Sequence, residues 1–393
     1  MSERSDQTAP QACEQPAPWL SRLCAFKDSQ EALLFLMKNY PFLQKGLPKE
    51  LAILGSSEIA ASLVEPLRAC NICISGVFDH NPEKTGTMLG PVAVRPFADL
   101  VGLGSEIPVI VATHRLGRAF DSLTSAGCKK LIPFSLLNLL EPDFFPPHPF
   151  YCGMIDDLIA SRDNIARLYR RLHDEVSRAT LDAVIGFRLT LDPSVFQRVL
   201  SPFPYCAPDI LGFGADEVML DGGAFNGDTT ALFSELVGNR FRRILAVEPS
   251  DAPRLAMALK YRDDPRVIIV DACLYNQLTT ISFDTSESRV SAIAATGTGC
   301  AAVTIDSLEC ADEITFIKLN IEGAESKALE GARNVILGRA PKLAVAAYHA
   351  PSDLWRIAEE IVALRNDYRL MLRQHDSGTI ETVLYAVSKN IKV

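Results

Sequence analysis

A glycine-rich turn in the C-terminal half of the sequence combines an acidic residue with a sharp change of chain direction. Residues 218–229 read VMLDGGAFNGDT, so an apolar strand ends in Asp221, and Gly222, Gly223 and Gly227 let the main chain turn into a helix. Glycines also allow a ligand to approach the main chain more closely than a Cβ would permit. Because a carboxylate precedes the glycines, the turn suits a ligand with an ammonium and a sulfonium group rather than a pyrophosphate.

Two neighbouring strand ends carry further candidate ligand-binding residues. Glu248 ends the strand in ILAVEPS, about 20 residues beyond the glycine turn, where an acid can accept both hydroxyls of a ribose. The alternative is a surface glutamate at a strand end. Asp271 and Ala272 follow the next strand, where an adenine edge would be read, although Asp271 fits a helix cap equally well.

Three side chains at later strand ends are candidate proton acceptors. A methyl group on a sulfonium is already activated, so an enzyme mainly aligns the reacting atoms and excludes water, but a hydroxyl acceptor must also lose its proton. Glu322 follows the fourth strand and is the first choice. His349 follows the fifth strand, and His375 lies beside the last turn. A structural, hydrogen-bonding role is the alternative for each, and it is favoured for His375.

The elements around these residues predict an α/β domain over residues 205–393. The last strands, within residues 368–387, surround an Asp-Ser-Gly turn and form an antiparallel hairpin. Five parallel strands finished by such a hairpin are the layout of a class I methyltransferase Rossmann-like sheet, whereas a plain dinucleotide-binding fold would end with another parallel strand. The five predicted parallel strands are residues 218–221, 244–248, 267–271, 315–320 and 343–348.

The N-terminal part of the sequence predicts a second, smaller α/β unit. Residues 1–45 are a disordered and then helical segment, residues 46–140 a small Rossmann-like domain, and residues 141–204 a Pro-rich linker with a helical connection. Short apolar strands that alternate with helices indicate a parallel sheet in the small domain. Its first strand is expected at the start of residues 51–60, which continue into a Gly/Ser turn and a helix, and the others at residues 72–79, 107–114 and 129–134.

The small domain is similar to the nucleotide-binding domains attached to sugar-modifying enzymes, through LAILGSSEIA and GVFDHNPEKTG. Its glycine fingerprint keeps only Gly55, because Ser57 and Ala60 replace the later glycines. This loss argues against a tightly bound dinucleotide. Acceptor docking, oligomerisation and a scaffold role are the remaining interpretations.

Charge and composition exclude several classes of function. The 393 residues carry a formal net charge of −9, and such a surface repels nucleic acid. No apolar run approaches the roughly 20 residues that a membrane-spanning helix needs. The N-terminus has no apolar signal core, so a cytoplasmic protein is expected. The sequence leaves the oligomeric state open, a homo-oligomer included.

Over about residues 205–390, the sequence resembles the FkbM-type methyltransferases. The matching motifs, in the order of the family, are DGGAFNGDT, AVEPS, TIDSL, FIKLNIEGAE, YHAPSDLW and ETVLYAV. The resemblance implies S-adenosylmethionine as the cofactor and O-methylation as the activity. It also implies a small-molecule or glycan acceptor, such as a sugar or another polyhydroxylated metabolite.

One position departs from the family pattern. The fourth strand of the family reads Ile-Lys-Xaa-Asp-Xaa-Glu-Gly, and Asn320 takes the place of the aspartate. We count Asn320 among the cofactor-binding candidates and assign no metal ligand, since an amide cannot act as a base and binds a divalent cation weakly. Two alternatives therefore stand beside the enzyme: an impaired, cofactor-binding scaffold in glycan assembly, and an NAD-dependent oxidoreductase built on the N-terminal domain.

Overall fold

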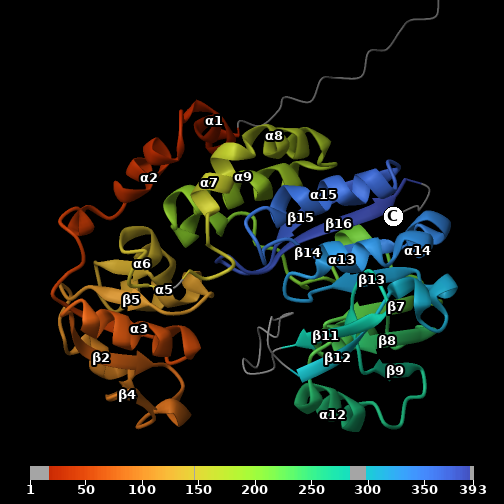
Figure 1. Cartoon of the computed structure of the whole chain (residues 1–393), viewed down its shortest axis with the longest axis horizontal. Helices are drawn as coiled ribbons and strands as arrows, with labels where there is room; N and C mark the ends of the chain where they lie inside the picture. The colour runs from red at the N-terminus through yellow and green to blue at the C-terminus, as the bar shows by residue number, and fades with distance from the viewer. Residues whose placement is uncertain (1–16, 146, 284–297, 390–393) are drawn as a thin grey trace, which may run out of the picture.

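The computed structural model describes residues 17–145, 147–283 and 298–389. A six-stranded sheet from the N-terminal part and a seven-stranded sheet from the C-terminal half lie on opposite sides of the molecule, and helices connect them (Figure 1). Residues 1–16, within the segment expected to be disordered, lie outside the described ranges. None of the helices in the described ranges combines the length and apolar character that a membrane crossing requires.

The N-terminal sheet confirms the predicted parallel α/β unit and adds two strands. Its order is β3-β4-β2-β1-β5-β6, and only β3 runs antiparallel to its neighbour. The sequence pattern misses β3 and β4 because they are short and mostly not buried, so they carry no apolar signature. The strands are β1 (Glu50–Leu54), β2 (Cys73–Asp79), β3 (Met88–Leu89), β4 (Val92–Pro96), β5 (Val109–Val111) and β6 (Leu131–Pro133). The helices around them are α3 (Glu58–Ala69), α4 (Phe97–Val101), α5 (Leu116–Ser125) and α6 (Phe134–Leu140).

The helical part of the segment expected over residues 1–45 consists of two helices. Helix α1 (Pro18–Ala25) ends where Phe26 becomes extended. Asp28 then caps α2 (Ser29–Met37), because its side chain accepts a hydrogen bond from the backbone N–H of Glu31. The sequence contains this cap, but the apolar spacing continues across it and conceals the break.

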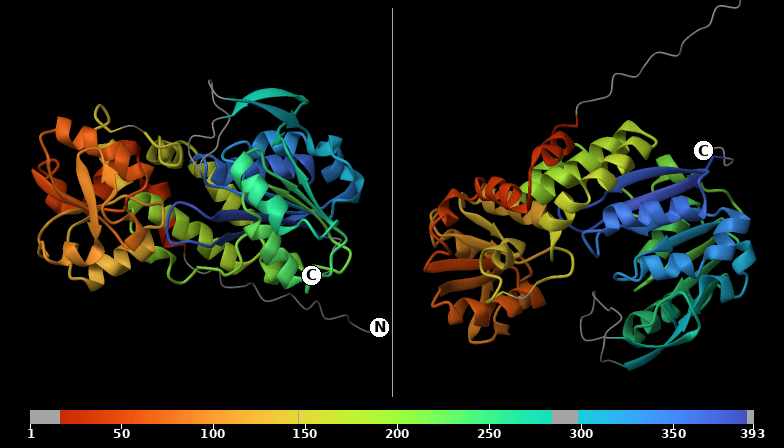
Figure 2. Two further views of the ribbon diagram at one scale, coloured as in Figure 1. Left: turned by 90° about the horizontal axis from the view of Figure 1, so that it is seen from below. Right: turned by 45° about the horizontal axis from the view of Figure 1, so that its top comes forward.

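The helical connection forms where it is predicted, and its last helix joins the two halves of the molecule. It consists of α7 (Met154–Ala160), α8 (Arg162–Arg171) and α9 (Glu175–Thr190). Helix α9 packs against α1 and α2 on one side and against the C-terminal sheet on the other (Figure 2). A Cβ at Gly186 would lie 2.7 Å from the indole of Trp19, so glycine is what allows α1 to approach α9 closely.

The C-terminal sheet confirms the predicted class I methyltransferase layout of five parallel strands and an antiparallel hairpin. Its order is β15-β16-β14-β13-β7-β8-β9, and only β16 runs against its neighbours. The strands are β7 (Val218–Gly222), β8 (Arg243–Val247), β9 (Val267–Val270), β13 (Phe316–Leu319), β14 (Lys342–Ala346), β15 (Tyr368–Gln374) and β16 (Thr382–Ser388). Its helices are α10 (Pro208–Leu211), α11 (Asp228–Leu236), α12 (Asp251–Lys260), α13 (Glu325–Glu330), α14 (Arg333–Arg339) and α15 (Asp353–Leu364).

A small three-stranded sheet, absent from the sequence prediction, lies beside the main C-terminal sheet. It contains β10 (Cys273–Leu274), β11 (Thr279–Phe283) and β12 (Thr298–Val303). Strands β1–β6 fall within the range predicted for the small domain, and β7–β16 within that of the C-terminal domain. The domain boundaries themselves stay predictions.

Candidate active site

A cavity of about 1170 Å³ lies where the strand order of each sheet reverses. In the C-terminal sheet the reversal falls between β7 and β13, and Gly223 and Asn320, which follow these strands, line the cavity. In the N-terminal sheet it falls between β1 and β5, where Gly55 and Ala112 line it. Ligands of open α/β sheets bind at such points. The cavity is therefore a candidate ligand site shared by both sheets.

Asp221 lies beneath the glycine turn rather than in the cavity. Its side chain is fully buried, with Oδ1 2.8 Å from Lys318 Nζ and Oδ2 accepting a hydrogen bond from the Thr230 hydroxyl. The ammonium of Lys318 also donates to the carbonyl oxygens of Gly222 (3.1 Å) and Gly223 (2.8 Å). The expected contact between the Asp221 carboxylate and a ligand ammonium is thus replaced by an ion pair within the protein, which holds the turn in place.

The three glycines of the turn are required by the protein's own packing. A Cβ at Gly223, whose φ is +71°, would collide with the carbonyl oxygen of Asn320. A Cβ at Gly222 would lie 2.7 Å from the Leu274 side chain, and Gly227 adopts a φ of +74°. Of the three, only Gly223 lines the cavity. Close approach of a ligand is therefore not needed to explain the glycines, contrary to the reason inferred from the sequence.

Glu248 lines the cavity at the end of β8, and both of its carboxylate oxygens are held by backbone groups. Oε2 accepts a hydrogen bond from Phe225 N and Oε1 accepts one from Ser250 N, both at 2.8 Å. A carboxylate has about four acceptor sites, so each oxygen keeps one for a further donor. The side chain is 6% exposed, and its orientation is fixed before any ligand binds.

The structure separates the two residues expected near an adenine. Ala272 is buried and lines the cavity, as do its neighbours Cys273 and Leu274. Asp271 forms an ion pair with Arg254 at 2.7 Å, its side chain is 63% exposed, and it is not among the lining residues. The apolar strip beyond β9, without Asp271, is what lines the cavity.

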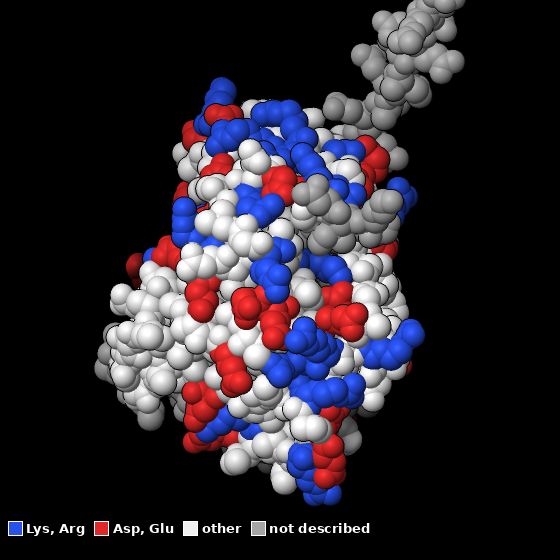
Figure 3. Space-filling view, turned by 90° about the vertical axis from the view of Figure 1, so that its right-hand side faces the viewer, with Lys and Arg blue, Asp and Glu red and all other residues white. Residues whose placement is uncertain are grey.

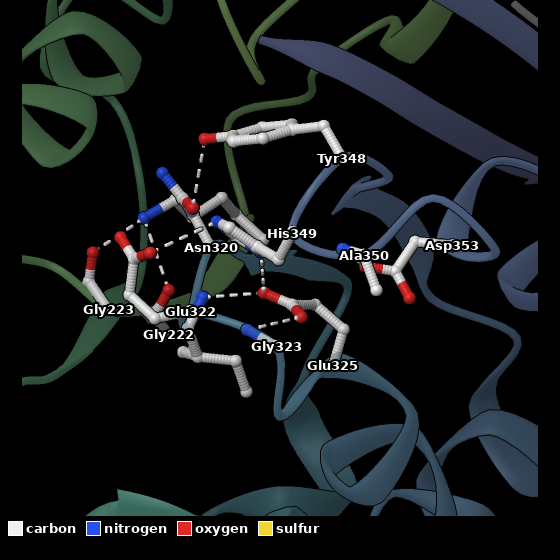
Figure 4. Close-up of polar contacts among 12 residues, drawn as sticks. Gly222, Gly223, Asn320, Glu322, Gly323, Glu325, Tyr348, His349, Ala350 and Asp353 are labelled. Carbon is white, nitrogen blue, oxygen red and sulfur yellow. Dashed lines mark hydrogen bonds and ion pairs between the residues drawn. The ribbon is translucent and has the colours of Figure 1, made fainter. Parts of the chain in front are cut away.

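Glu322, His349 and Glu325 form a row that runs inward from the cavity wall (Figure 4). Glu322 lines the cavity, and its Oε2 lies 3.4 Å from His349 Nε2. The other ring nitrogen, Nδ1, lies 2.9 Å from Glu325 Oε1. Glu325 is buried and accepts hydrogen bonds from the backbone N–H groups of Ile321 (2.8 Å) and Gly323 (3.0 Å), which fixes the whole row. Glu322 has a φ of +54°, an uncommon conformation for a residue other than glycine.

The charges of this row follow from burial and proximity. Burial would lower the pKa of His349, but the Glu325 carboxylate, with help from Glu322, raises it to about 9. Burial opposes ionisation of Glu325, yet His349 and the two backbone donors lower its pKa. Burial raises the pKa of Glu322 to about 7, although His349 counteracts the rise. His349 and Glu325 therefore form a charged pair, and Glu322 is the member that exchanges a proton near neutral pH.

His375 lies away from the cavity at the outer edge of the sheet. Its Nδ1 donates to the Ser201 carbonyl oxygen and its Nε2 accepts from the Tyr385 hydroxyl, both at 2.8 Å, and burial lowers its pKa to about 4. Strand β15 is separated from β13, which precedes Glu322, by β16 and β14. Of the three candidate bases, only Glu322 lines the cavity.

A family of known proteins matches the part of the chain that contains Glu248 and Glu322. Residues 221–372 match the model of the methyltransferase FkbM domain. We call residues 221–372 the FkbM domain after this match. No curated protein matches the sequence.

The fold of the chain is similar to that of a solved structure. The methyltransferase FkbM of Methylobacillus flagellatus KT is 23% identical, with a TM-score of 0.73 over 95% of this chain and 100% of that chain. The fold of that protein thus includes counterparts of both sheets. An rRNA methylase from Streptococcus thermophilus is 13% identical, with a TM-score of 0.32 over 46% of this chain and 90% of that chain.

Sequence reasoning misses three residues that line the cavity. Tyr205 and Tyr348 line the cavity, and the Tyr348 hydroxyl donates to the side-chain oxygen of Asn320 at 3.3 Å. Glu381 lines it directly before β16, and burial raises its pKa. We expect functional groups directly after parallel strands, and Glu381 instead precedes a strand. Because β16 runs antiparallel, it begins at the edge of the sheet where the parallel strands end.

The ion pair of His349 predicts a pH-dependent contribution to the stability of the FkbM domain. We expect His349→Gln to lower the free energy of unfolding by on the order of 3 kcal/mol below about pH 6.5, where histidine is protonated in both states. Because the folded-state pKa is raised to about 9, the difference from the wild type shrinks between pH 6.5 and 9 and is lost above that range. Urea unfolding at several pH values measures it. His80→Gln, at an exposed histidine, is the control; a difference that does not vary with pH contradicts the assignment.

Proposed function

We propose that the FkbM domain is an S-adenosylmethionine-dependent O-methyltransferase that acts on a hydroxyl of a sugar, a glycan or another polyhydroxylated metabolite. The observation that carries the proposal is the placement of two carboxylates on one cavity wall. Glu248, fixed by two backbone donors, and Glu322, with a pKa raised to about 7, lie at the ends of strands on either side of β7.

The lining residues fit the proposed cofactor. Glu248 has free acceptor sites for the two hydroxyls of a ribose. Ala272, Cys273 and Leu274 offer an apolar strip for an adenine. Gly223, through its main chain, and Asn320, through its side-chain amide, would hold the amino-acid end. When bound, the cofactor supplies a methyl group already activated by its sulfonium.

Glu322 performs the proton transfer in the proposed reaction. Its carboxylate would accept the hydroxyl proton of the acceptor, while the bound cofactor would supply the methyl group to the acceptor oxygen. A base with a pKa near 7 is ionised in a useful fraction at neutral pH and still holds the proton it receives. The charged His349, 3.4 Å behind it, orients the carboxylate without entering the cavity.

The surface charge supports a small-molecule or glycan acceptor rather than nucleic acid. The face at the right-hand side of Figure 1 carries acidic and basic side chains side by side instead of one continuous basic surface (Figure 3). With a net charge of −9, such a surface does not attract a phosphate backbone. We further propose a cytoplasmic location.

The cofactor assignment is tested by the variant Glu248→Ala. We expect it to weaken binding of S-adenosylmethionine by on the order of 1.5–3 kcal/mol, because hydrogen bonds to a charged group are lost. Isothermal titration of the full chain measures the dissociation constant, and Glu235→Ala, an exposed glutamate outside the cavity, is the control. An unchanged constant would mean that Glu248 does not hold the ribose, and no binding by the wild type at millimolar ligand would end the proposal.

A parallel measurement separates the oxidoreductase alternative. Ligands that bind only the folded state raise the melting temperature, so S-adenosylmethionine and NAD can be compared on the same protein. We expect a shift with S-adenosylmethionine and none with NAD.

A further inference from the structure

The N-terminal sheet contributes its own wall to the cavity, opposite the FkbM domain. The turn after β1, with Gly55, Ser56 and Ser57, and the segment after β5, with Thr113 and His114, line it at the point where that sheet reverses its strand order. The two sheets lie on opposite sides of the molecule (Figures 1 and 2). Residues that follow strands of both sheets line the one cavity. Its volume of about 1170 Å³ exceeds the roughly 300–1,000 Å³ of a pocket for one small ligand. The space therefore suits a second ligand beside the cofactor.

Hydrogen bonds within the protein fix a carboxylate on the N-terminal wall, and it can still accept hydrogen bonds from hydroxyl groups. Asp79, at the end of β2, lines the cavity. Its Oδ2 accepts from the Ser56 hydroxyl at 2.5 Å and its Oδ1 from Asn81 N at 2.8 Å. As with Glu248 across the cavity, each oxygen keeps an acceptor site. The neighbouring lining side chains of Ser57, Thr113 and Asn138 are neutral and polar.

An aromatic wall, formed by Phe134, His148, Phe150 and Tyr151, runs from this crevice toward Glu322. All four line the cavity; the rings of His148 and Phe150 lie 4.6 Å apart, and those of Phe134 and Tyr151 5.2 Å apart. The Phe150 ring also lies 5.4 Å from the His349 ring, directly behind Glu322. Burial lowers the pKa of His148 to about 4, so its ring is uncharged at neutral pH.

The charges on the cavity disfavour an anionic ligand. Six acidic and three basic side chains line it among the described residues, and one of the three, Lys318, is paired with the buried Asp221. A cationic cofactor fits this balance. On the N-terminal wall the acidic Glu58 and Asp79 are matched by the basic Lys84 and Arg115, so this wall carries no net charge and suits a neutral ligand. The acidic residues are Glu58, Asp79, Asp228, Glu248, Glu322 and Glu381.

From these observations we propose that the N-terminal wall is an acceptor subsite for a neutral, unphosphorylated saccharide of two or more rings. The aromatic wall packs against the apolar ring faces, Asp79 accepts hydrogen bonds from the hydroxyls of a non-reacting sugar, and the reacting hydroxyl reaches Glu322. The position of the reacting hydroxyl rests on the proposed function, but binding of the non-reacting sugar does not.

The test is an NMR titration of the full chain with neutral methyl glycosides, disaccharides and trisaccharides, set against sugar phosphates, UDP-sugars and NAD. We expect neutral di- and trisaccharides to bind, with dissociation constants that rise about tenfold in Asp79→Asn and in His148→Ala. Asp79→Asn keeps an oxygen for the Asn81 N–H and conserves the side-chain shape. Asp99→Asn, in the same sheet unit but outside the cavity, is the matched control and should bind like the wild type.

Titration of each variant with S-adenosylhomocysteine separates this proposal from the proposed function. If the nucleoside does not bind but saccharide binding responds to Asp79→Asn, the cofactor assignment fails and the subsite stands. If the nucleoside binds while no neutral saccharide does, or while sugar phosphates, UDP-sugars or NAD bind more tightly, the subsite is overturned and the cofactor assignment stands. Saccharide binding that is equal in the wild type and in both cavity variants also overturns it.

Discussion

Glu322→Gln is expected to lower the rate of methyl transfer by on the order of 10²–10⁴-fold, the usual contribution of a general base. The amide has nearly the shape of the carboxylate but cannot accept the hydroxyl proton. Glu322 is also not needed for the proposed ribose contact, so the dissociation constant for S-adenosylmethionine should stay close to that of the wild type. The measurement is transfer of a labelled methyl group to a panel of sugar acceptors, together with isothermal titration of the cofactor.

The pH profile gives this prediction a second readout. Because the base must be ionised and its pKa is raised to about 7, wild-type activity should increase with pH through about 7 and then level off. Glu359→Gln, at an exposed glutamate paired with Arg167, is the control and should keep wild-type activity. A Glu322→Gln enzyme with wild-type activity would exclude Glu322 as the base. A wild type that binds the cofactor but methylates no acceptor would favour the scaffold alternative, and Asn320→Asp would then be the variant to test for restored activity.

Lys318→Met is expected to destabilise the protein by about 3–5 kcal/mol, because it leaves the buried Asp221 carboxylate without its counter-ion. The ammonium also holds the carbonyl oxygens of Gly222 and Gly223, so the glycine turn loses three contacts at once. Urea unfolding of the full chain at neutral pH measures the free energy of unfolding. A loss of cofactor affinity should accompany it, since the turn borders the cavity.

Two controls show whether the ion pair is the cause. Lys327→Met breaks the exposed pair with Glu330 and should cost less than about 1 kcal/mol. The double variant Lys318→Met with Asp221→Asn removes both charges and should recover part of the lost stability. If Lys318→Met lowers the free energy of unfolding no more than Lys327→Met does, the ion pair between Lys318 and Asp221 does not stabilise the protein.

The sequence by itself determined the architecture of the C-terminal sheet. Its five parallel strands are apolar runs of the right length, and the Asp-Ser-Gly turn before residues 382–388 marks the antiparallel hairpin. Local pattern is sufficient there, because a strand buried on both faces must be apolar along its whole length. The sequence also sufficed to predict Glu248 and Glu322 as site residues, because the carboxyl ends of parallel strands meet at one edge of a sheet.

Only the tertiary structure decided what each side chain at that edge contacts. Asp221 is an acidic residue at the end of a strand, as a ligand-binding acid would be. In the structure, however, it forms an ion pair beneath the turn with Lys318 from the neighbouring strand. His349 and His375 look equivalent in sequence, but one lies behind Glu322 and the other beside Tyr385. A side chain's partners come from strands distant in the sequence, and their charges and burial set its pKa. For that reason the spacing of residues in the sequence was enough to predict where the site lies. The role of each side chain in the site could be inferred only from the packing of the two sheets around one cavity.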